Sequence, residues 1–392
     1  MSKWKECKLG DIAVLYNNSW KVGDEEFPYI ALEHIGEGSL RLNGFDHSSV
    51  VISNKYRFDE NNFLFGKLRP YFRKVVIPKF KGICSTDIWV IGSYNNTDLN
   101  FLFYLFANRE FVDLAYLGSS GTKMPRADWK FMKDTEWIIP QNIVEQKAIA
   151  SVLSSLDDKI DLLHRQNKTL EAMAETLFRQ WFIEEAEDDW KWVELGSFIE
   201  VMRGLSYKGS GLCLKNNGIP MHNLNSVYEG GGYKYEGIKY YSGDYKERHL
   251  IVPGDIIITN TEQGHDLLLI GFPAIIPKFY GNSGIFSQHI YKLNIKDKYL
   301  TTPFIYYLIM SHDVREQITG STNGSTVNML PKNGIEWAKF KLPPKKKINE
   351  FSLIVKQYLE KKEIIYNSIN TLEKLRDTLL PKLMSGEIRV KY

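Results

Sequence analysis

The feature that most constrains this chain is an internal repeat, because a sequence written twice predicts two copies of one structural unit. The segment WKECKLG at residues 4–10 returns as WKWVELG at residues 190–196. Further matched pairs follow in unchanged order: IPKF at 77 and 276, FLFYL at 101 and FIYYL at 304, SGT at 120 and NGS at 323, and LE at 170 and 372. Two copies are too few for a solenoid, so each copy is expected to be a domain with an appendage.

The composition fits two ordinary globular units. Apolar residues make up 43% of the 392 residues and charged residues 25%, which suffices for a core in each unit. The net charge of +3 comes from 50 basic and 47 acidic residues and neither requires nor excludes a nucleic-acid partner. The three cysteines form no CxxC pair, and no long apolar run occurs. We therefore expect a cytoplasmic protein without a signal peptide, a membrane-spanning helix or a zinc site.

The first part of each copy is expected to be rich in β-structure. Short β-branched or aromatic runs are separated by Gly, Asn, Asp and Pro, as is typical of a mixed domain with a bent sheet. The expected strands are 29–32, 63–65, 75–77 and 88–91 in the first copy and 256–259, 274–276 and 289–293 in the second. Segments 100–108 and 302–311 predict short amphipathic helices.

The last part of each copy predicts one long helix with a narrow apolar seam. Apolar residues recur at heptad spacing over 145–182 and 349–384, with Asn167, Lys362 and Arg376 also at seam positions. The seam residues are Leu156, Ile160, Leu163, Asn167, Leu170, Leu177 and Trp181 on the first helix and Tyr358, Ile365, Ile369, Leu372 and Leu379 on the second. Each seam fits one partner helix, and the other copy supplies it. The alternative is that each helix packs on its own domain.

These patterns predict an α+β protein with two mixed α/β domains related by a pseudo-twofold axis and separated by a long antiparallel two-helix coiled coil. The expected boundaries are 1–141 for the first domain, 142–185 for the first helix, 186–343 for the second domain, and 344–392 for the second helix and tail.

Motifs for catalysis do not occur in the sequence. It contains no GxxxxGK[ST], no GxGxxG, no HExxH and no (D/N/S)PP(Y/F) motif, and its eight histidines lack metal-ligand spacing. The adjacent carboxylates Asp157-Asp158 and Glu184-Glu185 are more typical of solvated helix faces than of acid–base pairs. The sequence therefore predicts no catalytic residue and no metal site, and favours a binding protein.

A basic and aromatic segment at 65–74, FGKLRPYFRK, is the first candidate for binding nucleic acid. Cations neutralise phosphates, and arginine reads guanine edges with two hydrogen bonds. Its candidate residues are Lys67, Arg69, Tyr71 and Arg73. The matching segment of the second copy is not basic but carries side chains that suit base edges, namely Asn260, Thr261, Gln263 and His265. A strand and turn with a cationic edge is the alternative for residues 65–74.

The second candidate is a glycine-containing loop in each copy, at 118–126 and 320–328. Short hydroxyl and amide side chains with exposed backbone N–H groups suit phosphate and base-edge contacts. The candidates are Gly121, Thr122, Lys123 and Arg126 in the first copy and Ser325, Thr326 and Asn328 in the second. An ordinary turn is the alternative.

Several segments resemble the specificity subunits of type I restriction-modification systems. EQKAIASVLSSLDDKID from Glu145, LFRQWF from Leu177 and LLPKLMSGEIRV from Leu379 are similar to the conserved regions of that family. FGKLRPYFRKV and GICSTDIWV resemble a target recognition domain, which adds Thr86 to the candidates. The second copy lacks an RPY segment, which separates it from this pattern.

The resemblance implies a non-catalytic subunit with two target recognition domains, each of which binds one half of a bipartite double-stranded DNA target. It implies two modification subunits that methylate adenine N6, and restriction subunits that cleave DNA with ATP. S-adenosylmethionine, ATP and Mg²⁺ would then belong to the partners, and this chain would hold no cofactor. The alternatives are a scaffold that only assembles partner enzymes, a specificity element of another multisubunit restriction-modification class, and an enzyme of unrecognised type.

Overall fold

The computed structural model describes residues 3–94, 96–121, 123–264, 266–324 and 327–391. The chain forms two compact units, of which unit 1 is built from two separate stretches of the chain and unit 2 from one continuous stretch. Unit 1 comprises Met1–Leu163 and Ser368–Tyr392, and unit 2 comprises His164–Asn367. The structure therefore groups the two long helices with the domains, whereas the sequence suggested separate helical segments.

Unit 1 contains a four-stranded antiparallel sheet in the order β2-β10-β7-β8. In this sheet Ile88 of β10 lies opposite Gly66 of β7, and the inner strands are buried. The strands are β2 (Ala13–Tyr16), β7 (Phe63–Gly66), β8 (Val75–Val76) and β10 (Ile88–Ser93). Three of them confirm runs expected from the β-branched and aromatic pattern.

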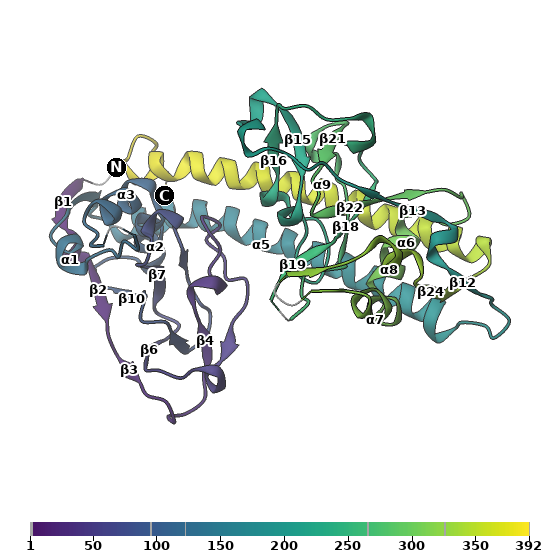
Figure 1. Ribbon diagram of the computed structural model, residues 1–392. Helices are drawn as coiled ribbons and strands as arrows, with labels where there is room; N and C mark the ends of the chain where they lie inside the picture. The colour runs from purple at the N-terminus through teal and green to yellow at the C-terminus, as the bar shows by residue number, and fades with distance from the viewer. Residues whose placement is uncertain (1–2, 95, 122, 265, 325–326, 392) are drawn as a thin grey trace. The chain divides into compact units, whose positions relative to one another are not determined.

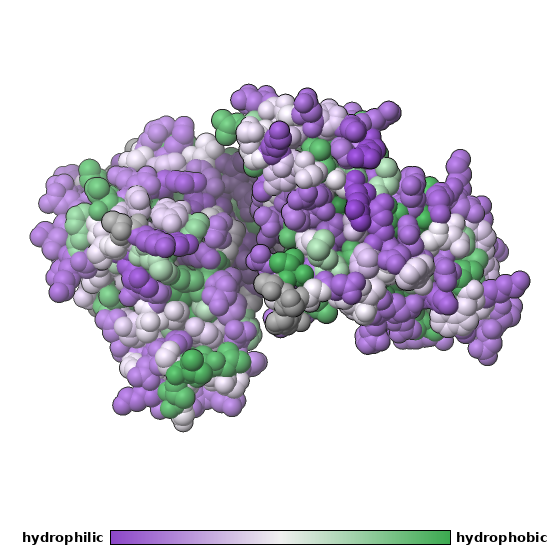
Figure 2. All heavy atoms as spheres, in the orientation of Figure 1, coloured by the Kyte–Doolittle hydropathy of each residue, from purple (hydrophilic) through white to green (hydrophobic). Residues whose placement is uncertain are grey.

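A second sheet of five strands has the order β3-β6-β9-β4-β5, and one of its pairs, β4-β9, is parallel with Tyr29 opposite Ile83. A separate ribbon joins β1 (Trp4–Lys8) to β11 (Glu136–Pro140). The strands of the five-stranded sheet are β3 (Ser19–Trp20), β4 (Pro28–Ile30), β5 (Asp46–His47), β6 (Lys55–Phe58) and β9 (Gly82–Cys84). In Figure 2 hydrophobic residues gather near the lower end of unit 1, just below the place where Figure 1 labels β4.

The helix α2 (Leu99–Ala107) is buried all round, so the expectation of an amphipathic helix here was wrong. Its residues 101–107 are all buried, because the four-stranded sheet and the long helices enclose it together. The Asp98 side chain accepts from the Phe101 amide at 2.9 Å and so fixes the start of the helix. The other short helices of unit 1 are α1 (Leu9–Ile12), α3 (Arg109–Leu117) and α4 (Trp129–Met132).

Unit 2 repeats this topology. Its four-stranded sheet has the order β13-β22-β18-β20, its ribbon joins β12 to β24, and its five-stranded sheet has the order β14-β16-β15-β21-β17. The strands are β12 (Trp192–Glu194), β13 (Ile199–Arg203), β14 (Leu212–Cys213), β15 (Ile219–His222), β16 (Lys239–Tyr241), β17 (Leu250–Ile251), β18 (Ile256–Thr259), β20 (Pro273–Ile275), β21 (Gly284–Phe286), β22 (Ile290–Ile295) and β24 (Lys339–Lys341). The helices are α6 (Thr302–Met310), α7 (His312–Gly320) and α8 (Lys332–Glu336).

Strand register shows that the two units are copies at the level of single residues. Ile88 lies opposite Gly66 in unit 1, and Ile290 lies opposite Thr259 in unit 2. The parallel pair recurs as β15-β21, where His222 lies opposite Phe286 as Ile30 lies opposite Cys84. The copies differ at both edges of this sheet: the fifth strand of unit 1, β3, lies beside β6, whereas the fifth strand of unit 2, β14, lies beside β16 at the opposite edge. The duplication predicted from the sequence is confirmed.

The long helices are α5 (Ile143–Arg179), which continues into a π-helical turn at Gln180–Glu184, and α9 (Lys345–Met384). Within each unit the two helices are antiparallel. In unit 1 Asp157 pairs with Arg376, while Ile149, earlier on α5, shares a core with Leu383, later on α9. In unit 2 Glu171 pairs with Lys362, and Phe182 packs against Phe351. Every residue predicted for the seam is buried or half-buried.

Both helices also enter the domain cores, so the two sequence alternatives for helix packing are both realised. Ile149, Leu153, Leu380 and Leu383 lie in one core with the sheet and α2 of unit 1. Phe178, Phe351 and Val355 lie in one core with the sheet and α6 of unit 2. The aromatic and aliphatic residues just beside the heptad seam, such as Phe178 and Leu380, provide this second contact face.

Candidate functional site

The two candidate motifs of unit 1, far apart in the sequence, form one surface. The Lys67 amide donates to the Asp87 carbonyl at 3.0 Å, and the Arg69 amide donates to the Pro125 carbonyl at 2.7 Å. The Ala127 amide donates to the Lys67 carbonyl at 2.9 Å. Residues 67–73, 85–87 and 118–126, with Thr122 outside the described residues, are called the loop surface of unit 1 below. It lies where β7 ends and where the turn between β9 and β10 begins.

Cations dominate this loop surface. Lys123 is exposed, and Lys67 and Arg69 are half-buried. The Arg126 guanidinium donates to both carboxylate oxygens of Asp87, from Nε at 2.8 Å and from Nη2 at 3.0 Å. This hydrogen-bonded pairing raises the pKa of Arg126. Thr86 is exposed in the same turn as Asp87, so the structure brings it beside the other candidates.

A tight 3-10 turn at Pro70–Phe72 shapes one edge of the surface. Arg69 and Arg73 on either side of it both adopt the left-handed conformation, with φ of 50° and 49°. Such conformations cost non-glycine residues free energy and persist only where the surroundings impose them. The turn presents the Tyr71 ring, which is partly exposed and packs edge-on against Tyr116 at 5.5 Å between centroids.

The prediction that Arg73 contacts a ligand is contradicted by its burial. Its side chain is 5% exposed, and its guanidinium binds the carbonyl of Gly38 and the carboxylate of Asp377 on α9. Burial lowers its pKa, and the neighbouring Asp377 carboxylate opposes that shift. A cation held in this way anchors the turn to α9 and does not reach a phosphate.

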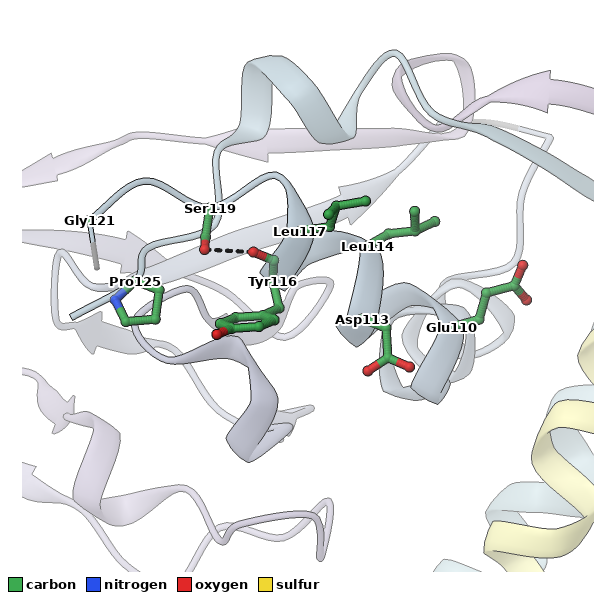
Figure 3. A pocket seen from close by; sticks show the side chains of 8 residues that line it. All are labelled: Glu110, Asp113, Leu114, Tyr116, Leu117, Ser119, Gly121 and Pro125. Atoms are coloured by element: carbon green, nitrogen blue, oxygen red, sulfur yellow. Dashed lines mark hydrogen bonds between the residues drawn. The ribbon is translucent and has the colours of Figure 1, made fainter. Parts of the chain in front are cut away.

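A shallow concavity of about 1060 Å³ lies beside the loop surface of unit 1. Figure 3 shows its wall on α3, with Leu114, Tyr116 and Leu117 on one side and Gly121 and Pro125 on the other. The Ser119 hydroxyl donates to the Tyr116 carbonyl at 2.6 Å and closes the end of the helix. Glu110 and Asp113 line the far end of the concavity. Their negative charges repel phosphate, whereas the cations of the loop surface attract it.

Unit 2 forms the equivalent surface with the same backbone contacts. The Asn260 amide donates to the His289 carbonyl at 3.2 Å, and the Leu330 amide donates to the Asn260 carbonyl at 2.9 Å. The strands β19 (Thr261–Gln263) and β23 (Val327–Met329) pair antiparallel. Residues 260–264, 287–289, 321–324 and 327–329 are called the loop surface of unit 2 below.

Buried and exposed residues divide the candidates of unit 2 into two groups. Asn260 and Thr261 are only 4% and 8% exposed, so the structure contradicts their prediction as direct contacts. The Asn260 amide group donates to the Gln288 carbonyl at 3.0 Å, and the Thr261 hydroxyl lies 3.2 Å from His289 Nδ1, so both residues position the neighbouring turn. Gln263 is exposed, and the half-buried Asn328 donates to the Gly264 carbonyl.

Exposed side chains that the motif search missed stand in the turn between β21 and β22. Gln288 and His289 are both exposed and lie 3.2 Å apart, Nε2 to Nε2. A signal for them existed, because SQH at 287–289 matches STD at 85–87 at the offset of the surrounding strands. The motif search also missed Asp87, which lies in the matching turn of unit 1. The predicted residues Thr122, His265, Ser325 and Thr326 lie outside the described residues.

The two loop surfaces carry different charges at equivalent positions. Strand pairing and the shared amide bonds match Lys67 to Asn260, Arg69 to Glu262, Asp87 to His289 and Arg126 to Met329. Unit 1 therefore has three cations where unit 2 has none with a permanent charge. Unit 2 has Glu262, whose carboxylate accepts from the amides of residues 268–270 at 2.7–3.0 Å and is thereby turned onto its own loop.

A glycine is required at the same point of both loops. Gly121 and Gly324 have φ of 91° and 136°, which side-chain-bearing residues rarely adopt. A Cβ on Gly324 would lie 2.1 Å from the Val327 carbonyl oxygen. The matched SGT and NGS segments are thus repeated because the loop folds back closely on itself.

Across the described residues no group of three or more His, Cys, Asp or Glu side chains is placed to hold a metal ion. No helix in the described part of the chain is both long enough and apolar enough to cross a bilayer.

Comparison with known proteins places this geometry in a family. Residues 1–172 and 187–374 each match the model of a family described as type I restriction modification DNA specificity domain. The type I restriction enzyme MjaVIII specificity subunit of Methanocaldococcus jannaschii is 24% identical over 99% of this chain and 93% of its own length. The MjaIX specificity subunit of the same organism is 27% identical over 74% of this chain and 69% of its own length.

A solved structure supports the fold. The S subunit of a type I restriction-modification system from M. genitalium aligns with a TM-score of 0.55 and 16% identity, over 97% of this chain and 96% of that one. Two family matches in one chain coincide with the two copies of the topology described above. The chain therefore belongs to the family of type I restriction-modification DNA specificity subunits.

Proposed function

We propose that this subunit binds a bipartite double-stranded DNA target, and that each loop surface binds one half-site. The observation that carries this proposal is the match between the two surfaces: the same backbone bonds hold both, while the side chains at equivalent positions differ. Equivalent frames place their side chains in equivalent positions on DNA, and different side chains select different bases. The half-sites are therefore unlike each other.

The chemistry of each surface suits a different balance of contacts. In unit 1, Lys67 and Lys123 supply charge for phosphates, Arg69 supplies N–H donors for a base edge, and Tyr71 supplies a hydroxyl donor and a flat face. In unit 2, Gln263, Gln288 and His289 supply amide and imidazole groups, which hydrogen-bond to base edges. The half-site of unit 1 should therefore contribute more of the salt dependence of binding.

The helix pair is proposed to set the number of unread base pairs between the half-sites. The ion pairs Asp157–Arg376 and Glu171–Lys362 step by fourteen residues along both helices in opposite directions, as one antiparallel register requires. In this proposal the helix pair is the connection that spaces the two half-sites. A shift of one heptad would therefore change the gap.

Exposed apolar side chains on both helices support the proposal of protein partners. Met173 on α5 and Leu353, Ile364 and Leu375 on α9 are exposed although their neighbours form cores. An open groove on unit 2 runs past Arg165, Ala172, Met173 and Tyr358. We propose that modification subunits, which methylate adenine N6, cover these faces and that restriction subunits join them. S-adenosylmethionine, ATP and Mg²⁺ are then bound by those subunits.

The test is the DNA methylation pattern directed by this chain. The chain should be expressed with the modification subunit of its own system in a host without other adenine methylation, and methyladenine should be mapped across the genome. A split motif with unlike halves is expected. A continuous motif, or methylation that is independent of this chain, would contradict the proposal. Binding of the complex to the motif should weaken as salt is raised, and a scaffold that binds only protein would show no such binding.

A further inference from the structure

We propose that Asp87 is a positioning residue that holds Arg126 to read a guanine in the half-site of unit 1. The proposal rests on the function proposed above and adds a base and a pair of residues to it. It starts from the orientation of the Arg126 guanidinium, which Asp87 binds from one side.

The pairing leaves one edge of the guanidinium free. Arginine has five N–H donors in a planar fork. Asp87 takes the Nε hydrogen and one Nη2 hydrogen, at 2.8 Å and 3.0 Å. The remaining edge, formed by Nη1 and Nη2, still has donors on both nitrogens. Two parallel donors match the O6 and N7 acceptors of guanine in the major groove.

Backbone bonds fix both partners of the pair before DNA arrives. Arg126 exchanges two backbone hydrogen bonds with Ser120, at 3.0 Å and 3.1 Å, and bridges to Leu68. The Asp87 carbonyl accepts from the Lys67 amide, and the Asp87 amide donates to the Ser85 hydroxyl at 3.3 Å. The flexible part that remains is the Arg126 side chain, and Asp87 orders it. Binding then costs less conformational entropy.

Exposure and charge both favour a base over a phosphate as the target of Arg126. The side chains of Arg126 and Asp87 are 45% and 25% exposed, so the free edge is accessible. The Asp87 charge offsets much of the attraction of Arg126 for a phosphate, whereas hydrogen bonds to a base edge need direction more than net charge. Lys123 and Lys67 beside the pair remain for the phosphates.

Unit 2 lacks this pair and so serves as an internal comparison. His289 stands at the position of Asp87, and Met329 stands at the position of Arg126 with its side chain 58% exposed. The structure thus assigns the guanine-reading pair to unit 1 alone. Because the backbone frame of unit 2 is the same, the Asp87–Arg126 pair could be introduced there at positions 289 and 329.

The experiment compares variants of the full chain in complex with its modification subunits, by mapping methyladenine motifs and by competition binding with duplexes that differ at single base pairs. Arg126→Ala should lose about 5- to 150-fold discrimination at one G·C pair of one half-site, the range for a two-hydrogen-bond contact. Asp87→Asn should lose part of that factor at the same base pair while total affinity for non-specific DNA stays constant or rises, because one negative charge is gone. Arg126→Lys should discriminate less than the wild type, because a lysine ammonium lacks the planar fork that binds Asp87 and a base edge together.

One control and one gain-of-specificity variant make the outcomes distinguishable. Arg57→Ala removes a half-buried arginine of the same unit, on β6 of the five-stranded sheet, that pairs with Asp24 and Glu25, and it should leave the motif unchanged. His289→Asp combined with Met329→Arg should create a new G·C requirement in the other half-site.

The result that overturns this inference is a wild-type split motif that Arg126→Ala or Asp87→Asn leaves unaltered, or that Asp87→Asn relaxes in a different half-site or at a different base pair from Arg126→Ala. Absence of any split motif for the wild-type complex would instead overturn the proposed function. Transfer of the pair to unit 2 gives a gain of specificity, which a misfolded variant cannot produce.

Discussion

Replacement of Arg376 by methionine should destabilise unit 1 far more than an equivalent change in unit 2. The Arg376 side chain is 1% exposed and donates to Asp157 at 2.8 Å and to the carbonyl of Ser39 at 3.1 Å. Without Arg376, the Asp157 carboxylate still accepts a hydrogen bond from the Tyr104 hydroxyl at 2.6 Å, but the carbonyls of Ser39 and Gly38 lose a donor. Removal of one partner from a buried pair costs about 3–5 kcal/mol. Since the Asp157 side chain is 22% exposed, we expect about 3 kcal/mol.

The magnitude converts into a measurable shift in melting temperature. For a unit of this size, each kcal/mol lowers Tm by roughly 2–4 °C, so the transition of unit 1 should fall by about 6–12 °C. Differential scanning calorimetry of the full chain gives the shift. Hydrogen exchange of peptides from residues 143–163 and 368–384 locates it in unit 1.

Two variants separate the ion pair from general effects of substitution. Lys362→Met removes the matching pair of unit 2, whose side chains are 26% and 32% exposed, and should cost no more than about 1 kcal/mol. Asp157→Asn combined with Arg376→Met should recover a substantial part of the lost stability, because no lone carboxylate then remains. If Arg376→Met costs no more than Lys362→Met, or if the double variant is as unstable as the single one, the reasoning from burial is refuted.

Three further predictions concern other parts of the molecule. Arg69→Ala should weaken DNA binding by about 1–3 kcal/mol and relax the base preference in the half-site of unit 1 only. Selection from random duplexes measures both half-sites, and a loss of preference in the half-site of unit 2 would contradict this prediction. Burial of His222 lowers its pKa to about 3 from 6.5, so its neutral form stabilises unit 2 fully above about pH 6.5, and this stability is lost as pH falls toward 3. Unfolding of His222→Gln followed against pH should show a shallower decline, and an identical decline would exclude this histidine as the cause. Deletion of one heptad from both long helices should alter the unread gap or abolish binding, and an unchanged gap in the methylation motif would show that the helices do not set it.

Much of the fold could be predicted because the signals were local or repeated. Heptad spacing determined which faces of α5 and α9 are buried, since a helix turns its side chains at a fixed period. The ordered repeat predicted two equal topologies, and short β-branched runs located the inner strands. The buried helix α2 was misjudged because its polarity pattern cannot show that packing partners enclose it on every side.

The candidate surfaces show the same division between what is local and what is not. Composition pointed to residues 65–74 and to the glycine loops, and the structure placed both motifs on one surface of unit 1. Composition could not show that Arg73 is bound to Asp377, 304 residues away in the sequence. Nor could it show that Asn260 and Thr261 are turned inward, while Gln288 and His289 in an unremarked turn are exposed.

The sequence by itself determined that one unit is written twice, that each copy ends in a long helix with a seam, and that the two loops differ in charge. These are properties of spacing and residue type, which can be read from the sequence before the chain folds. Only the tertiary structure decided that Arg73 is bound to Asp377 and that Asp87 and Arg126 meet. Such pairings depend on hydrogen bonds between strands and loops distant in sequence, and no local pattern encodes which distant residue a loop side chain meets.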